Sequence, residues 1–145
     1  MDYENYFDKI LKKMRLESVF KNTFLMVLYK NCEYPKFCAQ MPINPQPPIN
    51  IEIRDFIRIY KEAIKINPAI HDGAVMVKLS QKIPILTGWC FRLYPPPLAT
   101  RRKINRGSGY NTILDFSCVE NVEVTYFANT HELIKFKKGK EKVLV

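Results

Sequence analysis

The stretch from Asn67 to Val77 constrains the fold more than any other part of this sequence. An amphipathic segment ends at Ile66, and Pro68 stops it because proline cannot continue a helix. Residues 71–73, His-Asp-Gly, then make a polar turn, and the apolar run Ala74–Val77 begins a buried strand. A helix, a turn and a buried strand in this order predict an α/β unit with the turn at the mouth of the strand.

The turn carries the residue types that a phosphate or ribose site needs. Gly73 allows close approach to the backbone, and the Asp72 carboxylate can hold a metal ion or a sugar hydroxyl. The same residues also fit an ordinary Asp-Gly turn before a core strand, and the turn alone favours this simpler interpretation.

Length and composition indicate one globular domain that covers residues 1–145. The chain is 47% hydrophobic and long enough to bury a core without metals or disulfides. Its longest apolar runs, such as Thr23–Tyr29, are far shorter than a membrane span, and the polar, acidic residues 1–5 are unlike a signal peptide. The cysteines form no C-x-x-C pair and indicate reduced thiols, so we expect a cytoplasmic location: Cys32, Cys38, Cys90 and Cys118.

The net charge of +9 is unevenly distributed. No acidic residue lies between Gly73 and Leu114, whereas this span holds seven cations: Lys78, Lys82, Arg92, Arg101, Arg102, Lys103 and Arg106. A field without compensating carboxylates attracts anions, so the central group favours an anionic ligand. A second group, from Lys135 to Lys142, fits a solvated lysine-rich surface equally well.

The hydrophobic pattern predicts a mixed central β-sheet flanked by helices. The expected helices cover residues 2–19, a segment that begins at Asn50 as N-cap, and residues 110–116. The expected strands cover residues 23–29, 74–79, 82–93, 122–127 and 133–136, with a short edge strand near residues 37–41. A basic, proline-rich loop is expected over residues 94–109.

The segment His71–Val77 resembles the Pro-Leu-His-Asp-Gly-Ala-Val segment of the diadenylate cyclase (DAC) domain family. At pattern level, Asn22–Tyr29 is similar to the family's first core strand and Ile85–Phe91 to its small-x-Cys-aromatic strand. Residues 107–136 can be laid without a gap over the family's Gly-Thr-Arg-His-Arg helix, its Ser-Glu element and its last two strands. The resemblance covers residues 20–139 and implies a DAC-like fold.

In the family, two ATP molecules meet between facing domains, and each donates a 3′-hydroxyl to the other's α-phosphorus. The resemblance places Asp72, Gly73 and Ala74 at the ribose and at a Mg or Mn ion, with Asp72 as metal ligand and, if the domain is active, as catalytic residue. It places Gly107 and Ser108 at the phosphates and Ser117 in the third element of the pocket.

Two elements depart from the family pattern. Gly109, Tyr110 and Asn111 stand where the family has Arg, His and Arg, and Cys118 stands where it has Glu. Phosphoryl transfer depends on cationic donors, and deletion of a single such donor commonly costs about 10²–10³ in rate. The replacements that the sequence offers are Arg101, Arg102, Lys103 and Arg106 on the loop upstream, where binding tolerates loose positioning better than catalysis does.

Three hypotheses follow. The first is a nucleotide-binding sensor of ATP or a cyclic dinucleotide, which acts through an effector protein or a homo-oligomer. The second is an active, divergent diadenylate cyclase that makes cyclic di-AMP from two ATP, and the third is a scaffold for nucleic acid or protein on the basic surface. The altered arginine motif separates the first from the second, and the retained Asp72–Ala74 segment argues against the third. The first predicts one pocket of the following residues, with Arg101, Arg102 or Arg106 at the phosphates: Asp72, Gly73, Ala74, Ser108 and Ser117.

Overall fold

The computed structural model describes residues 2–80, 82–97 and 106–145. The strands in these ranges are β1 (Phe24–Tyr29), β2 (Cys38–Gln40), β3 (Ile51–Glu52), β4 (Ala74–Lys78), β5 (Ile85–Leu93), β6 (Val122–Ala128), β7 (Leu133–Lys137) and β8 (Lys140–Val143). The helices are α1 (Tyr3–Leu16), α2 (Phe56–Ile66), the 3-10 helix η1 (Pro68–Asp72) and α3 (Gly107–Phe116). None of the helices in these ranges combines the length and the apolarity required to cross a membrane.

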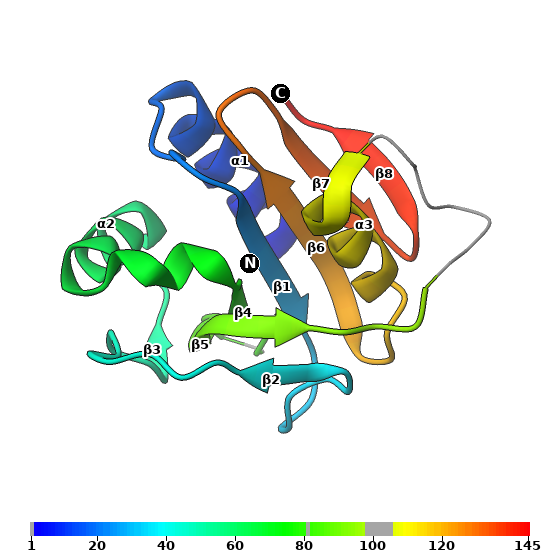
Figure 1. Ribbon diagram of the computed structural model, residues 1–145, viewed down its shortest axis with the longest axis horizontal. Helices are drawn as coiled ribbons and strands as arrows, with labels where there is room; N and C mark the ends of the chain where they lie inside the picture. Colours follow the sequence, from blue (N-terminus) through cyan, green and yellow to red (C-terminus); the bar gives the residue numbers. More distant parts are fainter. Residues whose placement is uncertain (1, 81, 98–105) are drawn as a thin grey trace.

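One mixed sheet organises the domain, which confirms the predicted fold class (Figure 1). The strand order is β2-β5-β4-β1-β6-β7-β8, and β3 pairs with β5 beside this path. The strands β1 and β4 run parallel in its interior, with Leu25 opposite Ala74, and β6 runs antiparallel on the other side of β1. The predicted strand near residues 37–41 is present as β2, and the predicted terminal hairpin is present as β6 and β7.

Helices cover both faces of the sheet, so its inner strands are continuous apolar runs. Alternate side chains of a strand point to opposite faces. Met26 and Leu28 of β1 accordingly belong to the core under α1 and α2, whereas Val27 and Tyr29 belong to the core under α3. The result is a three-layer arrangement in which, among the described residues, α3 covers one face and α1 and α2 cover the other, as seen in Figure 1.

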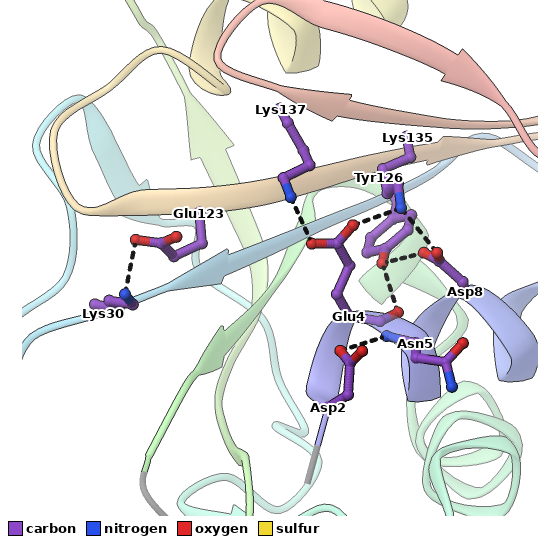
Figure 2. Close-up of polar contacts among 9 residues, drawn as sticks. All are labelled: Asp2, Glu4, Asn5, Asp8, Lys30, Glu123, Tyr126, Lys135 and Lys137. Carbon is purple, nitrogen blue, oxygen red and sulfur yellow. Dashed lines mark hydrogen bonds and ion pairs between the residues drawn. The ribbon is translucent and has the colours of Figure 1, made fainter.

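An ion cluster around the buried side chain of Lys135 fastens α1 to the C-terminal half of the sheet (Figure 2). The ammonium of Lys135 on β7 lies 2.6 Å from Glu4 and 2.8 Å from Asp8. The Tyr126 hydroxyl donates to Asp8 at 2.7 Å, and Lys137 contacts Glu4 at 2.8 Å. Burial lowers the pKa of Lys135, but its bonds to Asp8 and Glu4 outweigh this effect and raise that pKa overall.

The second helix begins later than its pattern predicts. Asn50 is no N-cap: its φ is 58°, its N–H donates to the Leu86 carbonyl, and the next two residues form β3 against β5. Asp55 caps α2 instead, because its carboxylate accepts from the Arg58 N–H at 3.3 Å. The prediction failed because pairing with β5 extends the chain over residues 51–52, a long-range contact that periodicity does not reveal.

The third helix begins earlier than predicted, and β8, like β3, was not predicted. Residues 107–109 form the first turn of α3 rather than the end of a basic loop; residues 98–105 of that predicted loop lie outside the described ranges. A first turn tolerates Gly107 and Gly109, since packing against the sheet stabilises α3. Strand β8 follows a two-residue turn at Lys138 and Gly139, both of which have positive φ, as hairpins of this kind require.

Candidate functional site

The His-Asp-Gly turn lies where two parallel strands begin. The helix η1 is capped by Asn67, whose side chain accepts from the Ala69 N–H, and it ends at Asp72. Gly73 then leads into β4, whose first residue, Ala74, is buried opposite Leu25 of β1. The turn therefore occupies the end of the sheet at which both β1 and β4 enter it.

Close packing against β5 explains Gly73. A Cβ at this position would lie 2.5 Å from the carbonyl carbon of Cys90 and 2.8 Å from the nitrogen of Phe91. The φ of Gly73 is −147°, an extended value open to any residue, so the requirement is space. Cys90 itself has a φ of 60° at an irregularity in the β4–β5 pairing. The sheet thus requires this glycine independently of any ligand.

Asp72 presents an accessible carboxylate beside this tight contact. Its side chain is 61% exposed, and its Oδ1 lies 3.2 Å from Nδ1 of His71. The negative charge of Asp72 also acts on Cys90 in β5. The pKa of Cys90 is raised, mainly by burial of the thiol and to a smaller extent by the Asp72 charge. An exposed carboxylate with one neighbouring imidazole retains lone pairs for a sugar hydroxyl or a metal ion.

The first turn of α3 lies at the same end of the sheet. A Cβ on Gly109 would lie 3.4 Å from Thr23, which precedes β1, and 3.6 Å from Phe127 near the end of β6. Gly107 and Ser108 are exposed in this turn. The first N–H groups of a helix have no intrahelical partner and carry partial positive charge, so this end of α3 suits an anion.

Arg106 lies immediately before α3 but is already engaged. Its Nη2 lies 2.8 Å from the Glu132 carboxylate, and its guanidinium carbon lies 4.3 Å from the centroid of the Tyr110 ring. The Arg106 side chain remains 32% exposed. It can reach a phosphate at the α3 N-terminus only in competition with Glu132.

The residues predicted to stand at the His and second Arg of the DAC pattern point into the domain. Tyr110 is buried, and its hydroxyl donates to the Glu141 carboxylate; burial first and Glu141 second raise the pKa of Tyr110 to about 12. The Asn111 amide donates to the Gly107 carbonyl at 3.1 Å. Tyr110 joins α3 to β8, whereas this Asn111 bond lies within α3, and neither side chain supplies a cation.

Ser117 lies apart from the other predicted pocket residues. It follows the last turn of α3, about 15 Å from the first turn at the usual rise per residue. The side chain is fully buried, and its hydroxyl donates to the Leu114 carbonyl at 2.6 Å and accepts from the Gly139 N–H at 2.9 Å. The structure brings Asp72, Gly73 and Ala74 to the same sheet end as Ser108, but not Ser117.

The sequence pattern missed two acidic neighbours of this region. Glu132 and Glu141 contact Arg106 and Tyr110 from 26 and 31 residues further along the chain, and no local motif relates these pairs. Arg101 and Arg102, predicted to contact phosphates, lie outside the described ranges. Within those ranges, no three His, Cys, Asp or Glu residues form a metal-binding group.

Known structures resemble this chain at low sequence identity, whereas no family model and no curated protein matches its sequence. A structure described as a hypothetical membrane spanning protein from Bacillus cereus aligns with a TM-score of 0.65 and 13% identity over 100% of this chain. That alignment covers 64% of the neighbour, so the chain spans less than two thirds of its length.

A double mutant of DacA from Staphylococcus aureus aligns with a TM-score of 0.60 and 15% identity over 95% of this chain and 83% of its own. Identities this low show the fold and nothing further about the chain. The protein therefore has a DAC-like fold, the architecture that its His71–Val77 segment predicted.

Proposed function

We propose that this protein is a DAC-like nucleotide-binding domain that senses a nucleotide or a nucleotide second messenger without cyclising it. One observation carries the proposal: the Asp72–Ala74 turn and the first turn of α3 lie at the same end of a DAC-like sheet. The resemblance assigns these two elements to the ribose and the phosphates, and their shared position at one end of the sheet supports this assignment.

The bound nucleotide extends from the turn to α3. Its ribose hydroxyls meet the exposed Asp72 carboxylate, and its phosphates meet the free N–H groups at the start of α3 and the hydroxyl of Ser108. A Mg or Mn ion fits this arrangement, because such ions commonly take one or two protein carboxylates and complete their shell with phosphates and water. Asp72 is the carboxylate that would hold it.

The same geometry supports binding without catalysis. Transfer of an α-phosphoryl group needs cationic donors fixed where charge develops. Gly109 has no side chain, and Tyr110 and Asn111 are directed into contacts with Glu141 and Gly107. We propose that binding is signalled through an effector protein or a change in self-association.

Calorimetry and thermal-shift measurements against ATP, GTP and cyclic dinucleotides, with and without Mg²⁺ or Mn²⁺, test the proposal. We expect at least one of these nucleotides to bind, and Asp72→Ala to weaken it about tenfold or more, as befits loss of a hydrogen bond to a charged group. Glu62→Ala, a change at an exposed acid on α2, is the matched control and should leave affinity unchanged. Unaltered affinity in Asp72→Ala would place the ligand elsewhere.

A separate assay tests the absence of turnover. The protein is incubated with ATP and Mn²⁺, and the products are separated by chromatography. We expect no cyclic dinucleotide above background. Robust product formation would show that the arginines upstream of α3 support catalysis, and the domain would then be an active diadenylate cyclase.

A further inference from the structure

A cavity lies on the opposite face of the sheet from α3. It has a volume of about 190 Å³ and lies between α2, η1 and the segment that leads into β1. Seven residues line it: Val19, Lys21, Asn22, Tyr60, Ile64, Pro68 and His71. Tyr60 belongs to the core under α1 and α2, whereas the first turn of α3 adjoins the other core. The cavity meets the proposed nucleotide site at His71, whose Nδ1 lies 3.2 Å from the Asp72 carboxylate.

Tyr60 has a buried ring and a hydroxyl with no partner. The residue is only 6% exposed, and its ring packs edge-on against Phe24 at 5.4 Å and close to Phe20 and Trp89. Within the described ranges the hydroxyl makes no hydrogen bond, and its oxygen is not among the fully buried polar atoms, so it remains accessible to solvent. Since neighbouring rings enclose the aromatic part, the hydroxyl is the end that reaches the cavity.

Each of the four polar residues around the cavity can donate a hydrogen bond: Lys21, Asn22, Tyr60 and His71. Burial raises the pKa of Tyr60 to about 12, so its hydroxyl keeps its proton at neutral pH. Lys21 brings an ammonium group that has no ion-pair partner among the described residues, and Asn22 brings an amide. No carboxylate is among the seven lining residues. Such a set of donors selects an oxyanion.

The volume and the apolar walls of the cavity limit further which ligands it can bind. A volume of about 190 Å³ is below the roughly 300 Å³ at which pockets for drug-sized ligands begin, so a whole nucleotide does not fit. Val19, Ile64 and Pro68 form apolar walls that suit a flat hydrocarbon ring. We propose that this cavity is a binding site for a small aromatic carboxylate, whose oxygens accept from the Tyr60 hydroxyl and face the Lys21 ammonium.

Benzoate is the probe, and amide chemical shifts of the ¹⁵N-labelled full-length protein are the readout. We expect benzoate to shift the amide resonances of residues 19–22, 64 and 69–71 in a saturable way. Benzamide, which has the same shape without the charge, should bind more weakly. Tyr60→Phe and Lys21→Gln should each weaken benzoate about tenfold or more, whereas Lys9→Gln, at an exposed lysine on α1, should not.

The stability of Tyr60→Phe provides an independent check. A hydroxyl without a partner contributes nothing to the free protein, so we expect the variant to melt at the same temperature or slightly higher. A marked loss of stability would reveal an internal partner for the hydroxyl and overturn the proposal. Absence of saturable shifts with benzoate, or equal affinities of Tyr60→Phe and the unmodified protein, would overturn it as well. None of these outcomes depends on nucleotide binding.

Discussion

The backbone of Cys90 approaches Gly73 so closely that a Cβ on the glycine would lie 2.5 Å from the Cys90 carbonyl carbon. We therefore expect Gly73→Ala to destabilise the domain by about 1–3 kcal/mol or more, because the backbone of β5 must move to admit the methyl group. Urea unfolding measures the change. Asp72→Ala, one residue away on an exposed side chain, should leave stability nearly unaltered. Equal stabilities of the two variants would mean that β5 yields without strain.

The docking of α1 should weaken in acid. Burial raises the pKa of Glu4, but its bonds to Lys135 and Lys137 outweigh this effect and lower the pKa overall. A lowered folded-state pKa means that the stabilisation is present above the unfolded value of about 4.3 and is lost as pH falls through the folded value. The pKa of Lys135 is raised in the folded protein. The stabilisation that Lys135 contributes is therefore lost only when the pH rises through this raised pKa.

Unfolding free energies measured between pH 3 and pH 8 test this dependence. We expect stability to fall below about pH 4.3 and Glu4→Gln to flatten part of that fall. Glu52→Gln, which removes an exposed acid paired only with Arg54 in the described ranges, is the control and should leave the profile unchanged. An acid profile that is identical in Glu4→Gln would exclude this cluster as its cause.

Glu132 should restrain nucleotide binding through Arg106. The two side chains form an ion pair at 2.8 Å, and a phosphate at the start of α3 must compete with the carboxylate. We expect Glu132→Gln to tighten nucleotide affinity and Arg106→Gln to weaken it and to reduce its dependence on salt. Calorimetry at two salt concentrations measures both effects. If the two variants change affinity in the same direction, the ion pair acts by holding α3 rather than by competing for the ligand.

Ser117 should matter for stability and not for ligand affinity. Its buried hydroxyl joins the end of α3 to the turn at Gly139, and Ser117→Ala leaves that N–H without its acceptor. We expect a loss of about 1–3 kcal/mol in the unfolding free energy. Nucleotide affinity measured on the folded variant should match that of the unmodified protein. A selective loss of affinity would instead return Ser117 to the nucleotide site.

Local patterns in the sequence predicted most elements because their evidence lies within a few residues. The apolar runs of β1 and β4 indicate strands covered on both faces, and the three- and four-residue spacing of Phe7, Leu11 and Met14 indicates the buried side of α1. The Asp72–Ala74 turn could also be predicted from the sequence, because a proline, a glycine and the start of an apolar run mark it. The fold class followed from the order of these elements.

Only the tertiary structure decided which distant residues share a site. The order of the strands brings Asp72 and the first turn of α3 to one end of the sheet, and the length of α3 takes Ser117 to the other. The partners of Arg106 and the unpaired hydroxyl of Tyr60 depend on contacts across the fold. Periodicity reports which face of an element is buried, whereas the identity of the neighbour on that face is set by long-range packing that no local pattern contains.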